Sequence, residues 1–428
     1  MNSKDYLLSG ESFRFKKERE SSQKSLSDEE INEKYKKGEI RIVTEQARYP
    51  LDTIETMLDS KKYDLNPEYQ RRKRWDKVRK SRLIESFIIN VPIPPIFLYE
   101  VDYSFYEVMD GLQRLTAIYD FYTGAFELEG LEYWQELNGI KYKDLPEQVK
   151  RGIDRRYLSS IILLQETAKS EEEAEFLKQM VFERLNSGGE LLTPQEIRNA
   201  LHNGKFNQLC IKLGRNEHFR KMWKLPLESE PEKELLASER YRKMEDVELV
   251  LRFFAYRHIE EFSGMTVENF LDEYLKHANN YPEETLEQLQ TLFNETVEVV
   301  YEIFGDSAFL LPQTIGKKYT APTKTIYDAI MQAFSRNIKN KEEFINNAKR
   351  IKQNLYVKPK LFVPRKKTDK YIFDGRYNGS NAVQERIDFY HQFLQDYISC
   401  ELRVENCVST KNSGLEKLIH REPQSDLF

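Results

Sequence analysis

The hydrophobic pattern of the chain changes once, near residue 205, and this change constrains the fold more than any other feature. Before it, short apolar runs such as residues 91–102 and 158–165 alternate with apolar positions at helical spacing. After it, strand patterns nearly disappear and long helical stripes follow, for example over residues 283–304. We therefore predict an α+β domain at residues 41–205, with a small mixed sheet and helices, followed by an all-α domain at 206–400.

The two ends of the chain differ from the middle. Residues 1–40 contain nine basic and nine acidic residues and few apolar ones, so we predict a weakly packed, charged N-terminal arm that is partly helical over residues 27–40. Residues 401–428 are predicted to form a tail. The start lacks the apolar segment of a signal peptide, and no run of about 18 apolar residues suggests a membrane span. The three cysteines match no zinc or redox spacing, which favours a cytoplasmic location.

A net charge of -5 argues against general binding to nucleic acid, so any such contact must come from a local patch. Eight of the twelve residues 71–82 are Lys or Arg; Trp75 lies among them and Tyr69 just before them. Such a run is either a solvated helix face or a surface that binds a nucleotide or nucleic-acid backbone. Residues 339–370, with eleven basic and three acidic residues, form a rival patch.

Residues 105–124, FYEVMDGLQRLTAIYDFYTG, predict a strand, a tight turn and a helix. Asp110 occupies the expected N-cap position and Gln113 follows three residues later, so a capping box explains these two residues. It explains neither Arg114 nor Gly111. The alternative is phosphate binding at the helix start. Because a carboxylate there would repel phosphate, this alternative needs Mg²⁺ between them, with Asp110 holding the metal, Gln113 orienting water and Arg114 neutralising charge.

A third polar segment covers residues 182–201. Thr193 and Glu196 predict a capping box, with Pro194 at the first helical position. This turn does not require Asn186 or Arg198, so both are candidate binding residues. The chain contains none of the Walker A, dinucleotide-binding, HExxH or GxSxG motifs, and its six histidines are scattered.

Four segments, in this order, resemble the N-terminal domain family of GmrSD-type, modification-dependent restriction proteins, in the ParB/sulfiredoxin-like superfamily. They are residues 66–100, 108–118, 181–201 and 241–253. The resemblance implies a ParB-like fold for residues 41–205, nucleotide binding and hydrolysis at an Asp-Gly-Gln-Gln-Arg corner, and a role in anti-phage defence or restriction. Here Leu112 stands at the first Gln of that pattern, which removes one amide.

The predicted site combines these segments. Asp110, Gln113 and Arg114 are the candidate catalytic residues, and Asp110 is also the candidate ligand of Mg²⁺, the cofactor expected with a nucleoside triphosphate. The candidate nucleotide- or DNA-binding residues are Tyr69, Gln70, Arg71, Arg72, Arg74, Gly111, Asn186 and Arg198. We expect the corner at Asp110–Arg114 to share one cleft with the residues of this set at 70–72 and with Asn186.

Three functional hypotheses remain open. In the first, the chain is an NTP-binding and NTP-hydrolysing component of a restriction system that responds to DNA, including modified DNA. A separate nuclease chain would then cut, and a homo-oligomer is compatible with this hypothesis. In the second, it is a non-catalytic nucleic-acid-binding module with a degenerate nucleotide site. In the third, it is a metal-dependent nuclease that uses Asp110 and nearby acids.

Overall fold

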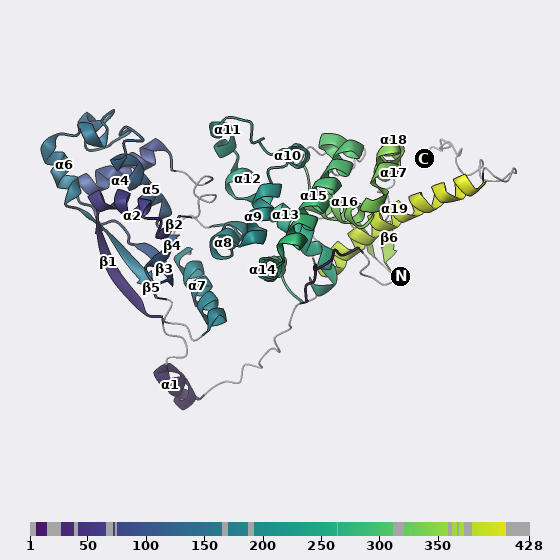
Figure 1. Cartoon of the computed structure of the whole chain (residues 1–428), viewed down its shortest axis with the longest axis horizontal. Coiled ribbons are helices and arrows are strands. Elements are labelled where there is room, and N and C mark those ends of the chain that lie inside the picture. Colours follow the sequence, from purple (N-terminus) through teal and green to yellow (C-terminus); the bar gives the residue numbers. More distant parts are fainter. Residues whose placement is uncertain are drawn as a thin grey trace.

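The computed structural model describes most of the chain. The described residues are 6–14, 27–37, 42–65, 72, 75–164, 170–186, 192–262, 264–310, 321–357, 362–365, 368–371 and 379–407. Figure 1 shows an elongated molecule with a sheet and its helices at one end and a larger group of helices at the other. No helix within the described ranges has the length and apolar character needed to cross a membrane.

A mixed sheet of five strands forms the frame of the first region, in the order β1-β5-β3-β4-β2. The strands are β1 (Thr44–Pro50), β2 (Tyr63–Asp64), β3 (Ile96–Asp102), β4 (Phe105–Asp110) and β5 (Tyr157–Leu163). Strand β1 is antiparallel to β5, β5 is parallel to β3, and β3 and β4 form an antiparallel hairpin. The predicted mixed sheet with helices is therefore confirmed.

Helices cover both faces of this sheet. Side chains alternate between the two faces of a strand, and β3 carries apolar side chains on each face, so each face needs a packing partner. Ile96 and Leu98 pack into one core with side chains of α2 (Ile54–Asp59), α4 (Lys77–Ile88) and α5 (Leu112–Tyr122). Phe97 and Tyr99 contact a smaller cluster on the other face, which includes Phe182 of α7 (Glu171–Asn186). Helix α6 (Glu147–Asp154) precedes β5. The corner between β4 and α5 is thus held by packing on both sides.

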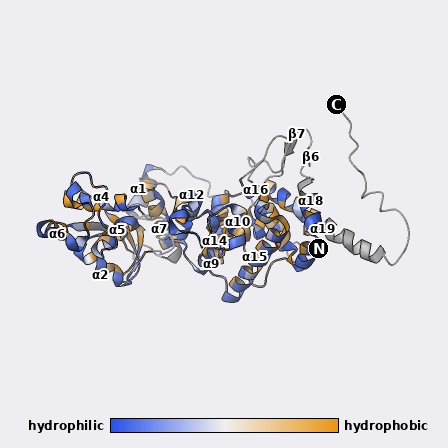
Figure 2. Ribbon diagram, turned by 90° about the horizontal axis from the view of Figure 1, so that it is seen from above, coloured by the Kyte–Doolittle hydropathy of each residue, from blue (hydrophilic) through white to orange (hydrophobic). Residues whose placement is uncertain are grey.

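Beyond residue 192 the described elements are mostly helices around one large apolar core, which includes Trp223, Phe254 and Phe293. The helices are α8 (Pro194–Leu201), α9 (Lys205–Leu213), α10 (Glu217–Trp223), α11 (Glu232–Ala237), α12 (Glu239–Arg242), α13 (Glu245–Ala255), α14 (Val267–Ala278), α15 (Glu283–Phe304), α16 (Lys324–Arg336), α17 (Lys341–Asn346), α18 (Ala348–Val357) and α19 (Ser380–Cys407). Figure 2 shows hydrophilic and hydrophobic residues along the same helices, as expected for amphipathic helices.

This helical region departs from the prediction of helices alone. Strands β6 (Phe362–Arg365) and β7 (Thr368–Tyr371) form an antiparallel pair. Each strand has only four residues. Runs of this length carry too few positions for a period-2 pattern to stand out beside long helical stripes.

The N-terminal arm contains its predicted helix, α1 (Asp28–Lys37), but it is not weakly packed throughout. Residues 6–14 pack against the helical region, where Phe13 is part of the core and the hydroxyl of Tyr6 donates to the Arg257 carbonyl over 2.8 Å. Helix α1 lies away from this core, next to the sheet end of the molecule (Figure 1). The composition of the arm does not predict this contact, because only a few of its side chains are buried. Glu11 and Phe13 are the main ones.

Candidate functional site

The corner between β4 and α5 is built around a glycine. Strand β4 ends at Asp110, helix α5 begins at Leu112, and Gly111 between them has a φ of 93°. An added Cβ at Gly111 would collide with the buried Ile96 side chain of β3. The turn therefore needs a residue that tolerates the left-handed region and has no side chain.

Replacing Gly111 with Ala is expected to lower the free energy of unfolding by about 2–5 kcal/mol, because left-handed strain and a core clash add together. Gly124→Ala is the matched control. Gly124 also has a positive φ, of 75°, but nothing lies within 4 Å of the position that an added methyl group would take. The control should cost about 1–2 kcal/mol. Urea unfolding of both variants measures the difference, and equal losses would show that the Ile96 contact is unimportant.

The predicted capping box at this corner is wrong. Asp110 belongs to the strand, Gly111 is the N-cap, and no side chain caps α5. Gln113 instead accepts a hydrogen bond at Oε1 from the backbone N–H of Trp75, over 2.9 Å. The first turn of α5 therefore keeps backbone N–H groups that no capping side chain satisfies, which is the arrangement that favours an anion.

Arg114 links the two sides of the corner. Its Nη2 donates to Oδ2 of Asp110 over 2.8 Å and to the carbonyl of Pro95 over 3.1 Å. The Arg114 side chain is 16% exposed and that of Asp110 is 51% exposed. The ion pair thus fixes a solvent-facing carboxylate beside the start of α5. It also neutralises the charge that would otherwise repel a phosphate.

Two buried donors at the corner have no partner among the described residues: Nε2 of Gln113 and Nε of Arg114. Buried polar groups are nearly always hydrogen-bonded, so a pair of unsatisfied donors calls for an acceptor such as water or a ligand oxygen. Leu112, in contrast, is 7% exposed and packs inward. The departure at Leu112 from the Gln that the resemblance implies is therefore a change within the core.

Arg72 and Arg198 do not occupy the predicted position at a binding surface. Arg72 is fully buried, and its Nη1 donates to Oδ1 of Asp246 over 2.6 Å. Arg198 is 2% exposed, and its Nε donates to Oδ1 of Asp272 over 2.5 Å. Both predictions of nucleotide or DNA contact are corrected, because each guanidinium is neutralised by a carboxylate of the helical region.

The remaining predicted binding residues cannot be placed. Tyr69, Gln70, Arg71 and Arg74 lie outside the described residues, as does the side chain of Asn186. The prediction that they share a cleft with the corner stays a prediction. Sequence reasoning also missed two contributors, Asp246 and the backbone N–H of Trp75. Asp246 lies 174 residues from its partner Arg72, so no local pattern could connect them.

The basic run 71–82 is not one helix. Helix α4 begins at Lys77, after the N-cap Asp76, whose side chain accepts from the N–H of Arg79. Two of its cations are paired: Lys80 with Asp120 over 2.6 Å, and Arg82 with Glu132 over 2.8 Å. Lys77 and Arg79 are exposed, and the Arg79 guanidinium lies 4.7 Å from the Trp75 ring centroid. The free positive surface is thus smaller than the sequence suggests.

The donor set at the corner fits only one kind of magnesium site. Within the described part of the chain, no three or more His, Cys, Asp or Glu side chains gather as potential metal ligands. Among the described residues 110–114 that form the corner, Asp110 alone offers an exposed carboxylate. That suits Mg²⁺ bound mainly by phosphate oxygens and water, since Mg²⁺ commonly takes one or two protein carboxylates. Among the described residues, no such group of acids gathers around Asp110, and the nuclease hypothesis stays untested.

Comparison with known proteins finds one family that matches the segment containing the corner. Residues 54–203 match the family described as GmrSD restriction endonuclease, N-terminal domain. No curated protein and no solved structure matches the chain. The matched segment runs from α2 to the end of α8 and contains the whole corner. The match covers 150 of the 428 residues, so it assigns residues 54–203, and not the whole chain, to the GmrSD restriction endonuclease N-terminal domain family.

Proposed function

We propose that this chain binds and hydrolyses a nucleoside triphosphate with Mg²⁺, as a DNA-responsive component of a restriction system. The observation that carries the proposal is the pair of unsatisfied buried donors, Gln113 Nε2 and Arg114 Nε, at the uncapped start of α5. A phosphate chain supplies the acceptor oxygens that these donors lack. The restriction-system family of residues 54–203 supports the same assignment.

Each corner residue has a distinct role in this proposal. Gly111 lets the phosphate approach the backbone N–H groups at the start of α5. Arg114 donates from Nε to a phosphate oxygen while Nη2 continues to hold Asp110. Gln113 donates from Nε2 to a phosphate oxygen or to the attacking water. Asp110 would hold Mg²⁺, which when bound neutralises phosphate charge.

A binding-only function is the second candidate, and the position of Leu112 favours it. A leucine that is 7% exposed cannot supply the hydrogen bonds of the amide that the family pattern has there. The corner would then bind nucleotide without turning it over. In both candidates DNA cleavage belongs to a separate nuclease chain, and DNA contact falls to the exposed basic residues of α4.

The experiment that separates the candidates has two steps. Mass spectrometry of protein as purified looks for a bound nucleotide. Phosphate release is then followed with ATP and with GTP, with and without Mg²⁺ and DNA. Mg²⁺-dependent turnover supports the first candidate, and binding without turnover supports the second. If neither nucleotide binds at any Mg²⁺ concentration, the proposed function is wrong.

The exposed cations at the start of α4 are expected to contribute salt-sensitive DNA binding. Replacing both Lys77 and Arg79 with Ala should lower affinity and reduce the log–log salt slope by about 2, since each lost phosphate contact is worth about 1. Arg151→Ala on α6 is the control, because that side chain is 71% exposed but pairs with Glu147 over 2.8 Å, so its loss should leave the salt slope unchanged. An unchanged salt slope would mean that this face of α4 is a solvated surface that does not bind DNA. The same substitutions among the basic residues of 339–370 would then show whether that patch binds DNA instead.

A further inference from the structure

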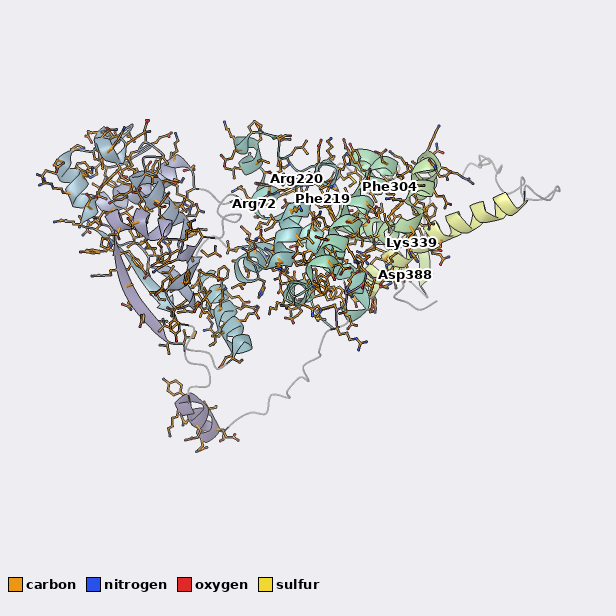
Figure 3. All side chains as sticks on the ribbon, viewed as in Figure 1. Arg72, Phe219, Arg220, Phe304, Lys339 and Asp388 are labelled. Atoms are coloured by element: carbon orange, nitrogen blue, oxygen red, sulfur yellow. The ribbon has the colours of Figure 1, made fainter. Side chains whose placement is uncertain are left out.

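A buried charge cluster joins the two regions of the molecule. It consists of Arg72, from the segment before α4, and Arg220, Glu228 and Asp246 of the helical region. Asp246 Oδ1 accepts from Arg72 Nη1 over 2.6 Å, and its Oδ2 lies 3.3 Å from Arg220 Nη2. Arg220 Nη2 also donates to Glu228 over 2.9 Å. Figure 3 shows Arg72 beside Arg220, where the sheet end of the molecule meets the helical region.

The cluster is balanced in charge, with two guanidinium groups and two carboxylates. Arg72 and Arg220 are fully buried, and the side chain of Asp246 is 1% exposed. Asp246 lies in the first turn of α13, where the helix dipole favours an anion. The Tyr241 ring lies 4.5 Å from Arg72 Cζ and 5.4 Å from Arg220 Cζ. Removing one partner from such a network leaves an uncompensated buried charge, which is strongly destabilising.

The segment that Arg72 anchors also touches the corner. Three residues after Arg72, the backbone N–H of Trp75 donates to Gln113 Oε1 over 2.9 Å. Three residues of chain span at most about 11 Å. A contact to the helical region and a contact to the candidate phosphate-binding corner are therefore made by one short segment. Because the Trp75 bond occupies Gln113 Oε1, it also orients the amide so that Nε2 remains the free donor.

We infer that Asp246 is a positioning residue for the corner, acting through Arg72 and Trp75. It holds Arg72, which lies three residues before Trp75 in the chain, and the Trp75 N–H holds the Gln113 amide. The helical region thereby sets how well the corner binds its ligand. This inference rests on the proposed function, and linkage makes it reciprocal: nucleotide at the corner stabilises the contact between the sheet domain and the helical region.

The first experiment needs no nucleotide. Only three tryptophans occur in the chain, so isotope-labelled tryptophan gives few backbone amide signals, and Trp75→Phe identifies the relevant one. Asp246→Asn should speed hydrogen exchange of the Trp75 amide at least about tenfold. Asp328→Asn is the control, because Asp328 is likewise 1% exposed and pairs over 2.7 Å with Arg252, which is 7% exposed. Equal acceleration by both variants would reduce Asp246 to a general stabilising role and overturn the inference.

The second experiment measures nucleotide affinity in Arg72→Met. This variant removes the hydrogen bond between Arg72 and Asp246 without leaving an unpaired buried cation. Asp246 keeps Arg220 as its partner. Affinity for Mg²⁺-ATP or Mg²⁺-GTP should fall about tenfold, within the usual range of coupling between sites. Affinity within twofold of the parent would overturn the inference and leave the proposed function intact. If the parent itself binds neither nucleotide, the proposed function fails, and amide exchange alone decides whether Asp246 positions Gln113.

Discussion

Replacing Asp110 with Asn is expected to lower Mg²⁺-dependent nucleotide turnover by about 10²–10³-fold, the scale of a lost preorganised electrostatic contact. Asn keeps the size of the side chain and its hydrogen bond to Arg114, but it removes the charge that would hold Mg²⁺. The measurement is phosphate release at saturating nucleotide. The proposed role of Asp110 predicts that the loss appears mainly in kcat.

The fold should survive this substitution. The Asp110 side chain is half exposed, so its ion pair with Arg114 is worth at most about 1 kcal/mol, and Tm should shift by a few degrees or less. Arg114→Ala is a poorer probe, because the same guanidinium also binds the Pro95 carbonyl and so supports the start of β3. A loss of activity in that variant would mix chemistry with structure.

Asp120→Asn supplies the matched control for Asp110→Asn. Asp120 lies on the same helix, α5, and pairs with Lys80 over 2.6 Å, but it is on a later turn than the corner. Turnover in this control should remain within about twofold of the parent. If Asp110→Asn also retains parental turnover, Asp110 is only a partner for Arg114, and its proposed role in holding Mg²⁺ is wrong.

The sequence predicted the local part of this site because local physics determines it. The strand ending at Asp110 and the helix after Gly111 follow from the change of apolar period at a glycine. The assignment of Asp110 as the N-cap was wrong by one residue. Helix boundaries are decided by backbone conformation, and the φ of 93° at Gly111 moves the cap onto the glycine itself.

The non-local part could not be predicted in the same way. Arg72 and Arg198 belong to polar segments that suggest binding, yet their partners Asp246 and Asp272 lie 174 and 74 residues away. A buried arginine and a phosphate-binding arginine look alike in a sequence, since both stand among other polar residues. Contacts with distant residues of the helical region decide between the two roles.

The N-terminal segment offers the second large effect. Glu11 is 5% exposed, and both of its carboxylate oxygens accept hydrogen bonds from the fully buried Arg257, over 2.6 and 2.8 Å. Glu11→Gln leaves that guanidinium without a buried counter-charge, which costs about 3–5 kcal/mol. We expect the urea midpoint of the helical region to fall by about 1 M or more, given typical slopes of a few kcal/mol per molar.

Glu33→Gln is the control for that substitution. Glu33 lies on α1 of the same arm and pairs with Lys36 over 3.3 Å, but its side chain is 60% exposed. Exposed pairs of this kind are worth little, so the urea midpoint should not move measurably. If Glu11→Gln behaves like this control, residues 6–14 do not stabilise the helical region, and their docking is incidental.

Acid titration gives Glu11 a second, independent signature. Burial alone would raise its pKa, but the charge and hydrogen bonds of Arg257 outweigh this and lower the pKa to about 2. Because the ordinary value of 4.5 applies in the unfolded chain, the unfolded state binds the proton first as pH falls. The stabilisation is complete above pH 4.5 and is lost towards pH 2. Glu11→Gln should therefore flatten the stability profile between these values, and an unchanged acid slope would assign that titration to other groups.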